Sequence, residues 1–183
     1  MKFKIFRFKK VKSTNNTALR IIKSTNCKYG MVISEIQTMG KGQFGNKWIS
    51  YKGNLFVSFF FELNRISLTI PNLTKINCLL IKKLLNHYYK KTIIFKKPND
   101  LLIKKKKICG ILQEVIFIAN SKYLVVGVGL NLIKSPKIKN YPTISLNKLT
   151  NKHINKRKLE NKLKLVFEKN LSKLYKVGTK LNK

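Results

Sequence analysis

Two apolar, β-prone runs lie in the second half of the chain: KICGILQEVIFI at residues 107–118 and YLVVGVGLNL at residues 123–132. A short polar segment, Ala-Asn-Ser at residues 119–121, separates them and suits a tight turn. Two strand-like runs joined by such a segment predict a β-hairpin. We therefore expect an antiparallel pair of strands here.

The rest of the chain combines strand-like and helix-like segments. Strands are expected at Lys2–Val11, Met31–Gln37, Asn54–Leu63 and Thr92–Phe95. Helices are expected through Ala18–Ile22 with N-cap residues Ser13-Thr14-Asn15, from Pro71 onward, and at Lys156–Lys176 with Gly178 as the end signal. The pattern predicts an α+β fold, a mixed β-sheet of six or seven strands flanked by helices, in a single domain over residues 1–183. It does not predict the strand order.

The charge is extreme, with 40 Lys and Arg against 6 Asp and Glu and a formal net charge of +34. Such a field attracts nucleic acid or an acidic partner. Nearly all of the excess is lysine, however, whereas base and phosphate recognition favours arginine. We therefore favour a compositional bias, and keep a non-enzymatic nucleic-acid-binding protein as an alternative.

The remaining composition indicates the compartment. No apolar run reaches the length of about 18 residues that a membrane span requires, and the N-terminal residues lack the apolar stretch of a signal peptide. Cys27, Cys78 and Cys109 form no C-x-x-C pair, which argues against a disulfide framework or a zinc site. We expect a reducing cytoplasm and no membrane partner.

The segment Gly40–Gly45 formally matches G-x-G-x-x-G. A dinucleotide site needs a helix directly after that loop, but residues 46–52 lead to a turn and another strand, and the G-K-[ST] ending of a P-loop is absent. Glycines still let main-chain amides approach an anion, and Lys41 and Lys47 add positive charge. We predict an anion-binding loop rather than a simple connection.

Two further motifs are ambiguous by themselves. Asp100, the one aspartate in the chain, could hold Mg²⁺ near phosphates or belong to a plain Pro-Asn-Asp turn. Glycines inside apolar runs, at Gly110, Gly127 and Gly129, mark close approach of a ligand or of another backbone, or else a bulge. Both alternatives stay open for each motif.

Six segments in series resemble the catalytic domain of biotin–protein ligases. They are Ser13-Thr14-Asn15, Gln37 with Gly40–Trp48, Gly53-Asn54-Leu55, Lys96–Asp100, Lys107–Glu114 and Gly127–Asn131. Each segment is short, but their order and spacing together are specific, and they cover roughly residues 1–175.

The resemblance implies a fold akin to the catalytic domains of class II aminoacyl-tRNA synthetases. It implies ATP-dependent activation of biotin to biotinyl-5′-AMP and transfer to a lysine of a biotin carboxyl carrier protein, with ATP and Mg²⁺ as cofactors. It also makes a homodimer plausible by analogy. Because the chain starts without a helix-turn-helix and ends after the last predicted helix, we expect the catalytic domain alone, without specific DNA binding and without the β-barrel that follows in many members.

The resemblance also assigns roles to residues. Lys96 would be catalytic and contact the carboxylate and the α-phosphate, and Gly110 and Gly127 would leave room for the ligand. Biotin-binding residues would be Ser13, Thr14, Asn15, Gln37, Gly40, Lys41, Gly42, Gln43 and Gly110. ATP or adenylate contacts would come from Lys41, Gln43, Asn46, Lys47, Trp48, Lys96 and Asn131, and Mg²⁺ contacts from Asp100 and Asn131.

The chain departs from the family at three positions within the six segments. Gln43 stands where an arginine is usual, Asn46 where another basic residue is common, and Lys97 where a tryptophan is usual. Glutamine donates hydrogen bonds without a charge, so looser retention of the adenylate is expected. A lipoate ligase or octanoyltransferase of the same fold, and a decayed domain that binds biotin without turnover, remain alternatives.

Overall fold

The computed structural model of the chain describes residues 2–64, 66, 68–118 and 120–181. These residues form one seven-stranded sheet in the order β1-β2-β3-β7-β6-β5-β4. Only β1 and β2 pair in parallel, so the predicted mixed sheet is confirmed. The strands are β1 (Lys4–Val11), β2 (Tyr29–Gln37), β3 (Leu55–Glu62), β4 (Ile94–Lys96), β5 (Asp100–Ile103), β6 (Lys106–Ile118) and β7 (Ser121–Leu130).

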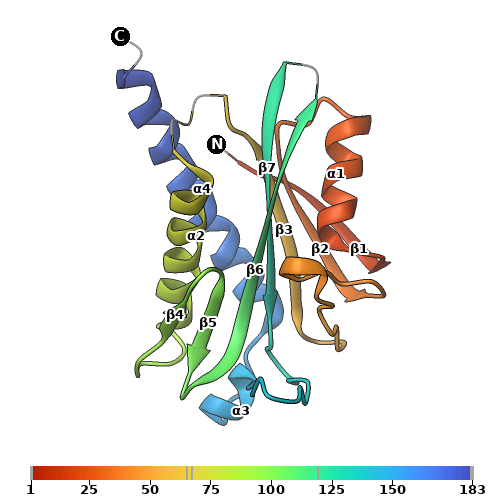
Figure 1. Ribbon diagram of the computed structural model, residues 1–183, viewed down its shortest axis with the longest axis vertical. Helices are drawn as coiled ribbons and strands as arrows, with labels where there is room; N and C mark the ends of the chain where they lie inside the picture. Colours follow the sequence, from red (N-terminus) through yellow and green to blue (C-terminus); the bar gives the residue numbers. More distant parts are fainter. Residues whose placement is uncertain (1, 65, 67, 119, 182–183) are drawn as a thin grey trace.

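Helices cover both faces of the sheet (Figure 1). Helix α1 (Thr14–Ser24) lies on one face, and α2 (Ile70–Leu85) and α4 (Lys156–Leu181) lie side by side on the other. The short α3 (Leu146–Thr150) lies near one end of the sheet. Within the described ranges, no helix has the length and apolar character needed to cross a lipid bilayer.

Strand β3 connects the two layers of the core, because all eight of its residues are buried. Side chains alternate between the faces of a strand, so neighbours belong to different clusters. Phe59 stacks on Phe167 of α4, with ring centroids 4.0 Å apart, whereas Phe60 packs with Ala18 of α1. A strand buried on both faces is apolar almost throughout, and the exceptions in β3 are Ser58 and Glu62, of which Ser58 later becomes part of the site.

Asn54 explains why the Gly-Asn-Leu segment precedes β3. Its side chain is fully buried, and its Oδ1 accepts hydrogen bonds from the backbone N–H groups of Leu132, Ile133 and Lys134 at 3.1, 2.9 and 3.1 Å. Its Nδ2 donates to the carbonyl of Lys134 at 2.7 Å. One side chain therefore fixes the chain leaving β7 against the start of β3.

The structure differs from the predicted elements in several places. Asp100 begins strand β5, which was not predicted, and α3 was not predicted either. Gly178 does not end α4, which continues to Leu181, because a glycine costs a helix interior only about 1 kcal/mol. Ser13 is the N-cap residue of α1, but its side chain makes no capping hydrogen bond. Ala119, in the predicted turn, lies outside the described residues.

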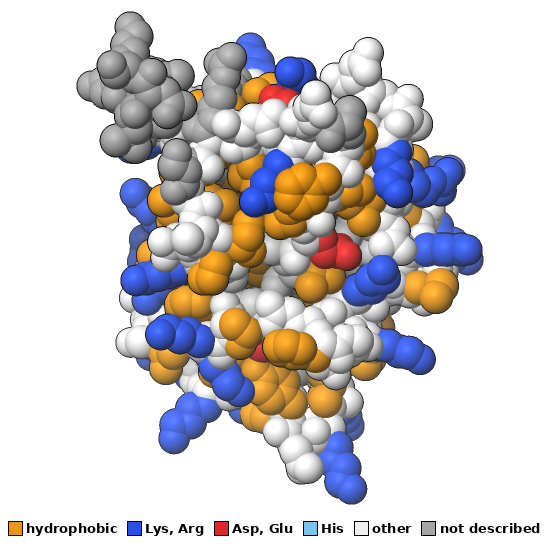
Figure 2. Space-filling view, turned by 45° about the horizontal axis from the view of Figure 1, so that its top comes forward, with side chains coloured by type: hydrophobic (Ala, Val, Ile, Leu, Met, Phe, Trp, Pro, Cys, Tyr) orange, Lys and Arg blue, Asp and Glu red, His pale blue; other side chains and the backbone are white. Residues whose placement is uncertain are grey.

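The positive charge is spread over the surface. Figure 2 shows Lys and Arg side chains scattered around the visible face rather than gathered in one patch. A nucleic-acid-binding protein concentrates its basic residues in a patch or stripe. The visible face therefore agrees with the compositional interpretation of the net charge of +34.

Candidate active site

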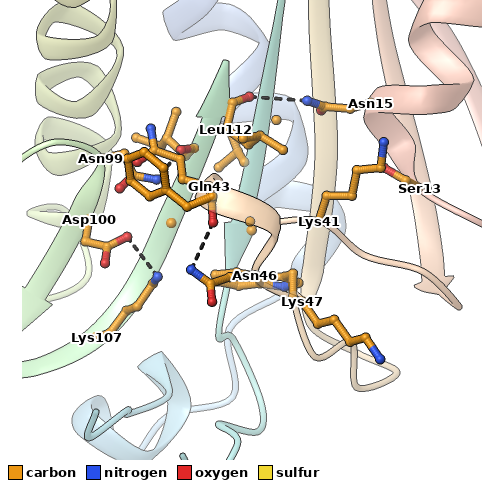
Figure 3. Close-up of a pocket in the computed structure, with 18 of the residues that line it drawn as sticks. Ser13, Asn15, Lys41, Gln43, Asn46, Lys47, Asn99, Asp100, Lys107 and Leu112 are labelled. Carbon is orange, nitrogen blue, oxygen red and sulfur yellow. Dashed lines mark hydrogen bonds and ion pairs between the residues drawn. The ribbon is translucent and has the colours of Figure 1, made fainter. Parts of the chain in front are cut away.

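Most of the predicted site residues line one cavity of about 420 Å³. It lies where the start of α1, the end of β2, the glycine-rich loop and strands β5 to β7 meet (Figure 3). The predicted residues that line it are Ser13, Thr14, Asn15, Gln37, Lys41, Gly42, Gln43, Asn46, Lys47, Trp48, Asp100 and Gly110. Gly40, Lys96 and Asn131 are not among the lining residues.

A network of neutral side chains occupies the α1 side of the cavity. Gln37 Oε1 accepts hydrogen bonds from the backbone N–H and the hydroxyl of Thr14, at 2.8 and 3.0 Å. Ser58 Oγ lies 2.8 Å from Thr14 Oγ1 and 2.5 Å from Asn15 Oδ1. Because buried polar groups are costly without partners, this network fixes the orientation of each side chain.

Glu114 extends this network from strand β6. Asn15 Nδ2 donates to Glu114 Oε2 at 2.6 Å and to the carbonyl of Leu112 at 3.3 Å. These bonds join α1 to the sheet across the cavity wall. Asn15 is thereby held on both sides, with its Oδ1 beside Ser58 and its Nδ2 beside Glu114.

Three glycines of β6 and β7 make room for side chains of the protein itself. Gly110 and Gly129 are directly paired, and a Cβ at either would lie 2.7 or 2.5 Å from the ring of Trp48. A Cβ at Gly127 would lie 2.4 Å from Asn15 Oδ1. Gly110 and Gly127 also line the cavity, so the expectation that they leave room for a ligand remains a prediction, and the room that they leave is shared with Trp48 and Asn15.

The glycine-rich loop forms a tight hairpin in this conformation. Trp48 N–H donates to the carbonyl of Gly40 at 2.9 Å, and Gly42 N–H donates to the carbonyl of Asn46 at 2.6 Å. Phe44 and Gly45, at its tip, both have positive φ, +53° and +75°. The amides of Gly42 and Trp48 are therefore engaged within the loop, and their contact with an anion would require the hairpin to open.

Gly40 closes the base of this hairpin. A Cβ there would lie 2.5 Å from the carbonyl oxygen of Trp48, so a larger residue would push the two arms apart. The lysines of the loop differ in direction. Lys41 Nζ donates to Asn16 Oδ1 at 2.9 Å, whereas Figure 3 shows Lys47 projecting away from the other labelled side chains.

Lys107 is the lysine that lines the cavity beside Asp100. Its Nζ lies 2.8 Å from Asp100 Oδ1 and 5.4 Å from the ring centroids of both Trp48 and Tyr141. Tyr141 OH donates to Asp100 Oδ2 at 2.6 Å. Burial, and then the hydrogen bond to Asp100, raise the pKa of Tyr141, so it remains a protonated donor at neutral pH. Figure 3 shows Lys107 and Asp100 directed at each other.

In contrast to Lys107, Lys96, which was predicted as the catalytic residue, lies at the surface. Its side chain is exposed, and its Nζ lies 3.4 Å from the hydroxyl of Tyr141 and 4.5 Å from its ring centroid. The catalytic role of Lys96 remains a prediction, but Lys96 does not line the cavity, whereas Lys107, which is paired with Asp100, does. Lys107 was part of a quoted motif, although the sequence reasoning gave it no role.

Asn131 is buried beside the cavity wall. Its Nδ2 lies 3.5 Å from the carbonyl of Lys107, and its backbone N–H donates to the carbonyl of Ile108 at 2.9 Å. These contacts place Asn131 against the backbone that carries Lys107. Its predicted contacts with ATP and Mg²⁺ remain predictions.

A few other residues of the site escaped the sequence reasoning. Ser58 had a usable signal, because it is the one polar residue in the apolar run 55–61. Glu114 had only its place in a motif. Tyr141 had none, because nothing local indicates that residue 141 returns to the side of Asp100.

A metal ion would find few protein ligands here. The described residues contain no cluster of three or more His, Cys, Asp or Glu side chains that could hold one. Among the residues that line the cavity, Asp100 is the single carboxylate. Mg²⁺ often binds through one or two carboxylates plus substrate phosphates, so Asp100 fits an ion that arrives with a nucleotide.

Comparisons with known proteins identify relatives of this chain. The bifunctional ligase/repressor BirA of Escherichia coli (strain K12) is 29% identical over 102 residues, which are 55% of this chain and 32% of that protein. BirA of Bacillus subtilis (strain 168) is 26% identical over 164 residues, 86% of this chain and 50% of that protein. The chain thus spans about a third to a half of the length of these curated relatives.

Solved structures share the fold. Biotin protein ligase from Aquifex aeolicus in complex with biotin and ATP has a TM-score of 0.78 and 27% identity, over 94% of this chain and 72% of that chain. Biotin protein ligase from Leishmania major in complex with biotinyl-5-AMP has a TM-score of 0.80 and 23% identity, over 96% of this chain and 75% of that chain, which shows the fold alone.

The sequence model of the Biotin/lipoate A/B protein ligase family matches residues 7–131, which include every predicted site residue and more than half of the chain. The matched region contains the polar network on α1, the glycine-rich hairpin and the Asp100–Lys107 pair. The chain therefore belongs to the biotin/lipoate A/B protein ligase family.

Proposed function

We propose that this chain activates biotin with ATP to form biotinyl-5′-AMP and then transfers biotin to a lysine of a biotin carboxyl carrier protein. The observation that carries the proposal is the division of one cavity. Figure 3 shows Ser13 and Asn15 on one side and Asp100 and Lys107 on the opposite side. A ligand with a neutral polar head and an acidic tail suits that division.

The neutral side suits the ureido ring of biotin. That ring carries N–H donors and a carbonyl acceptor but no charge, so it is matched by neutral groups that donate and accept. Thr14, Asn15 and Gln37 are such groups, and their mutual hydrogen bonds hold them in place. A preorganised set of partners lowers the entropic cost of binding.

The charged side suits the reaction. The carboxylate of biotin and the phosphates of ATP repel one another, so fixed positive charge must stand where the carboxylate oxygen attacks the α-phosphorus and pyrophosphate leaves. Lys107 is the lining lysine that an ion pair holds on this side, whereas the amine of Lys41 lies beside α1, where it donates to Asn16. Mg²⁺ bound to ATP would neutralise part of the phosphate charge, with Asp100 as a protein ligand.

The second step needs protection more than a nucleophile. The mixed anhydride must be kept from water until the acceptor lysine arrives, and a loop that folds over the cavity does this. The hairpin of residues 40–48 is that loop in our proposal. Its closure would place Gln43, which lines the cavity, beside the adenylate.

We also propose a cytoplasmic location and a homodimer. Cys27, Cys78 and Cys109 are free, which suits a reducing compartment. Strand β5 pairs with β6 only as far as Gly110, and the backbone of Ile111 bonds to Asn99. Among the described residues no strand pairs with the outer edge of β6 beyond Ile111, so that edge is open to another strand. Sedimentation velocity tests the dimer, and a monomer at all concentrations would contradict it.

The substrate test compares three acids. The chain is incubated with ATP, Mg²⁺ and a carboxylase carrier domain, together with biotin, lipoate or octanoate, and the carrier is read by intact mass. We expect a biotin adduct only. A lipoyl or octanoyl adduct would assign the chain to the other branches of the family, and salt-dependent nucleic-acid binding without any adduct would support the non-enzymatic alternative.

A further inference from the structure

The tip of the glycine-rich hairpin carries an unusually exposed aromatic residue. Phe44 is 92% exposed, more than any other large apolar side chain in the described part of the chain, and it nevertheless lies at the lining of the cavity. Exposed single hydrophobic residues are ordinary on protein surfaces. Phe44 differs because of its position and its backbone conformation.

The backbone conformation at position 44 favours residue types other than phenylalanine. Asn46 N–H donates to the carbonyl of Gln43 at 3.1 Å, and the two residues between them, Phe44 and Gly45, both have positive φ. This is the pattern of a type I′ turn, in which Asn-Gly is the preferred pair. A phenylalanine at the first central position has a Cβ that disfavours this conformation, and its exposed ring gains little packing in return.

The side chains around the ring indicate the chemistry of a partner. Lys41 and Lys47 form the bridge across the hairpin, and both are exposed. Ile138, 43% exposed, also lines the cavity. The mouth therefore presents apolar side chains flanked by positive charge, which complements an acidic surface that carries an apolar residue.

We propose that Phe44 is a docking residue for the acceptor protein, and that it contacts an apolar side chain beside the acceptor lysine on an acidic surface. This inference rests on the proposed function. A small ligand enclosed in the cavity would meet Trp48 and Tyr141, whereas the ring of Phe44 faces solvent, from which a macromolecule approaches. Aromatic side chains that become buried when two proteins bind contribute much of the affinity of protein interfaces.

The experiment compares two acceptors of the same adenylate. One is a biotin carboxyl carrier domain, and the other is hydroxylamine, which is too small to reach Phe44 while it attacks the anhydride. The variant Phe44→Asn removes the ring but suits the turn, so the hairpin is kept. Phe44→Leu keeps an apolar side chain, and Leu165→Asn, at a position that is 62% exposed on α4, is the matched control.

We expect Phe44→Asn to lower kcat/KM for the carrier through a raised KM. This loss should be about tenfold larger than the loss of rate with hydroxylamine. Phe44→Leu should recover most of the loss, Leu165→Asn should show no difference between acceptors, and the melting temperature of Phe44→Asn should not fall. Equal losses with both acceptors, a raised KM for ATP, or an unchanged KM for the carrier would overturn the proposal. Absence of hydroxamate with the unmodified chain would instead refute the proposed function, and this inference with it.

Discussion

Replacing Lys107 with methionine removes the charge but keeps most of the aliphatic stem. The ion pair of Lys107 with Asp100 has an N–O distance of 2.8 Å, and the side chain of Lys107 is 19% exposed. A unit charge at that distance is worth about 6 kcal/mol at an effective dielectric of about 20. The cost of removing both charges from water cancels part of this attraction. For the reaction, loss of one preorganised contact to the charge that develops in the transition state typically costs about 10²- to 10³-fold in rate. We expect that loss in adenylate formation.

The comparison with Lys96 makes the prediction specific. Lys96 is exposed and contacts Tyr141 at the surface, so from its geometry Lys96→Met should cost less than about tenfold, whereas the catalytic role that the family resemblance assigns to Lys96 requires a loss as large as that of Lys107→Met. The assay is biotin-dependent exchange of pyrophosphate into ATP. If the exchange rate of Lys107→Met stays within tenfold of that of the unmodified chain, or if Lys96→Met loses more of this rate than Lys107→Met, the assignment of Lys107 as the cation that assists adenylate formation is wrong.

A double variant separates the effect on folding from the effect on activity, and its activity reflects the loss of both Lys107 and the proposed Mg²⁺ ligand Asp100. Lys107→Met leaves the largely buried carboxylate of Asp100 without its cation, which should lower the free energy of unfolding by about 1–3 kcal/mol. Adding Asp100→Asn removes the unpaired charge, so urea unfolding should recover while exchange activity should not. Recovery of activity in the double variant would show that Lys107 only neutralises Asp100.

Three further outcomes follow from the site and the core. Ser58→Ala should lower the free energy of unfolding by about 1–3 kcal/mol and raise the KM for biotin, because Thr14 and Asn15 lose a fully buried partner; an unchanged KM would show that the network does not position the biotin site. Gln43→Arg should lower biotinylation of a bystander protein such as albumin, measured with labelled streptavidin, because an added cation holds the anionic adenylate more tightly; equal labelling would dismiss this idea. Burial, and then the charge of Asp100, raise the pKa of Cys78 to about 12, so its thiol stays protonated at pH 8. Cys78 should therefore react with iodoacetamide only as the pH approaches that value or after unfolding, and rapid labelling of Cys78 in the native protein at pH 8 would contradict this environment.

The sequence predicted the strands and helices better than their arrangement. The apolar run 55–61 identified β3, and the two runs around residue 120 identified the hairpin of β6 and β7, because their periodicity is local. Strand order depends on contacts between distant segments, so the position of β7 between β3 and β6 could not be predicted. Strand β5 has four residues directly after a proline-containing turn, too few for a clear pattern.

The site was predicted as a set of residues more accurately than as a geometry. The motifs meet in one cavity, but whether a lysine on a strand lines it, as Lys107 does and Lys96 does not, depends on strand register and on side-chain direction. Lys107 pairs with Leu102 next to a β-bulge, whereas Lys96 lies on the edge strand β4. The space beside Gly110 likewise depends on Trp48, which comes from a distant loop.

The most direct test of the central claim is to identify the product that the chain retains after incubation with biotin, ATP and Mg²⁺ in the absence of any carrier. The cavity, with a neutral network on one side and Lys107 on the other, predicts biotinyl-5′-AMP, detected by mass spectrometry of the ligand extracted from the protein, together with released pyrophosphate. Because Gln43 lacks the charge that would hold the anionic adenylate, the bound amount should be smaller than the amount of protein. Intact ATP and free biotin, with no adenylate and no pyrophosphate released, would contradict it.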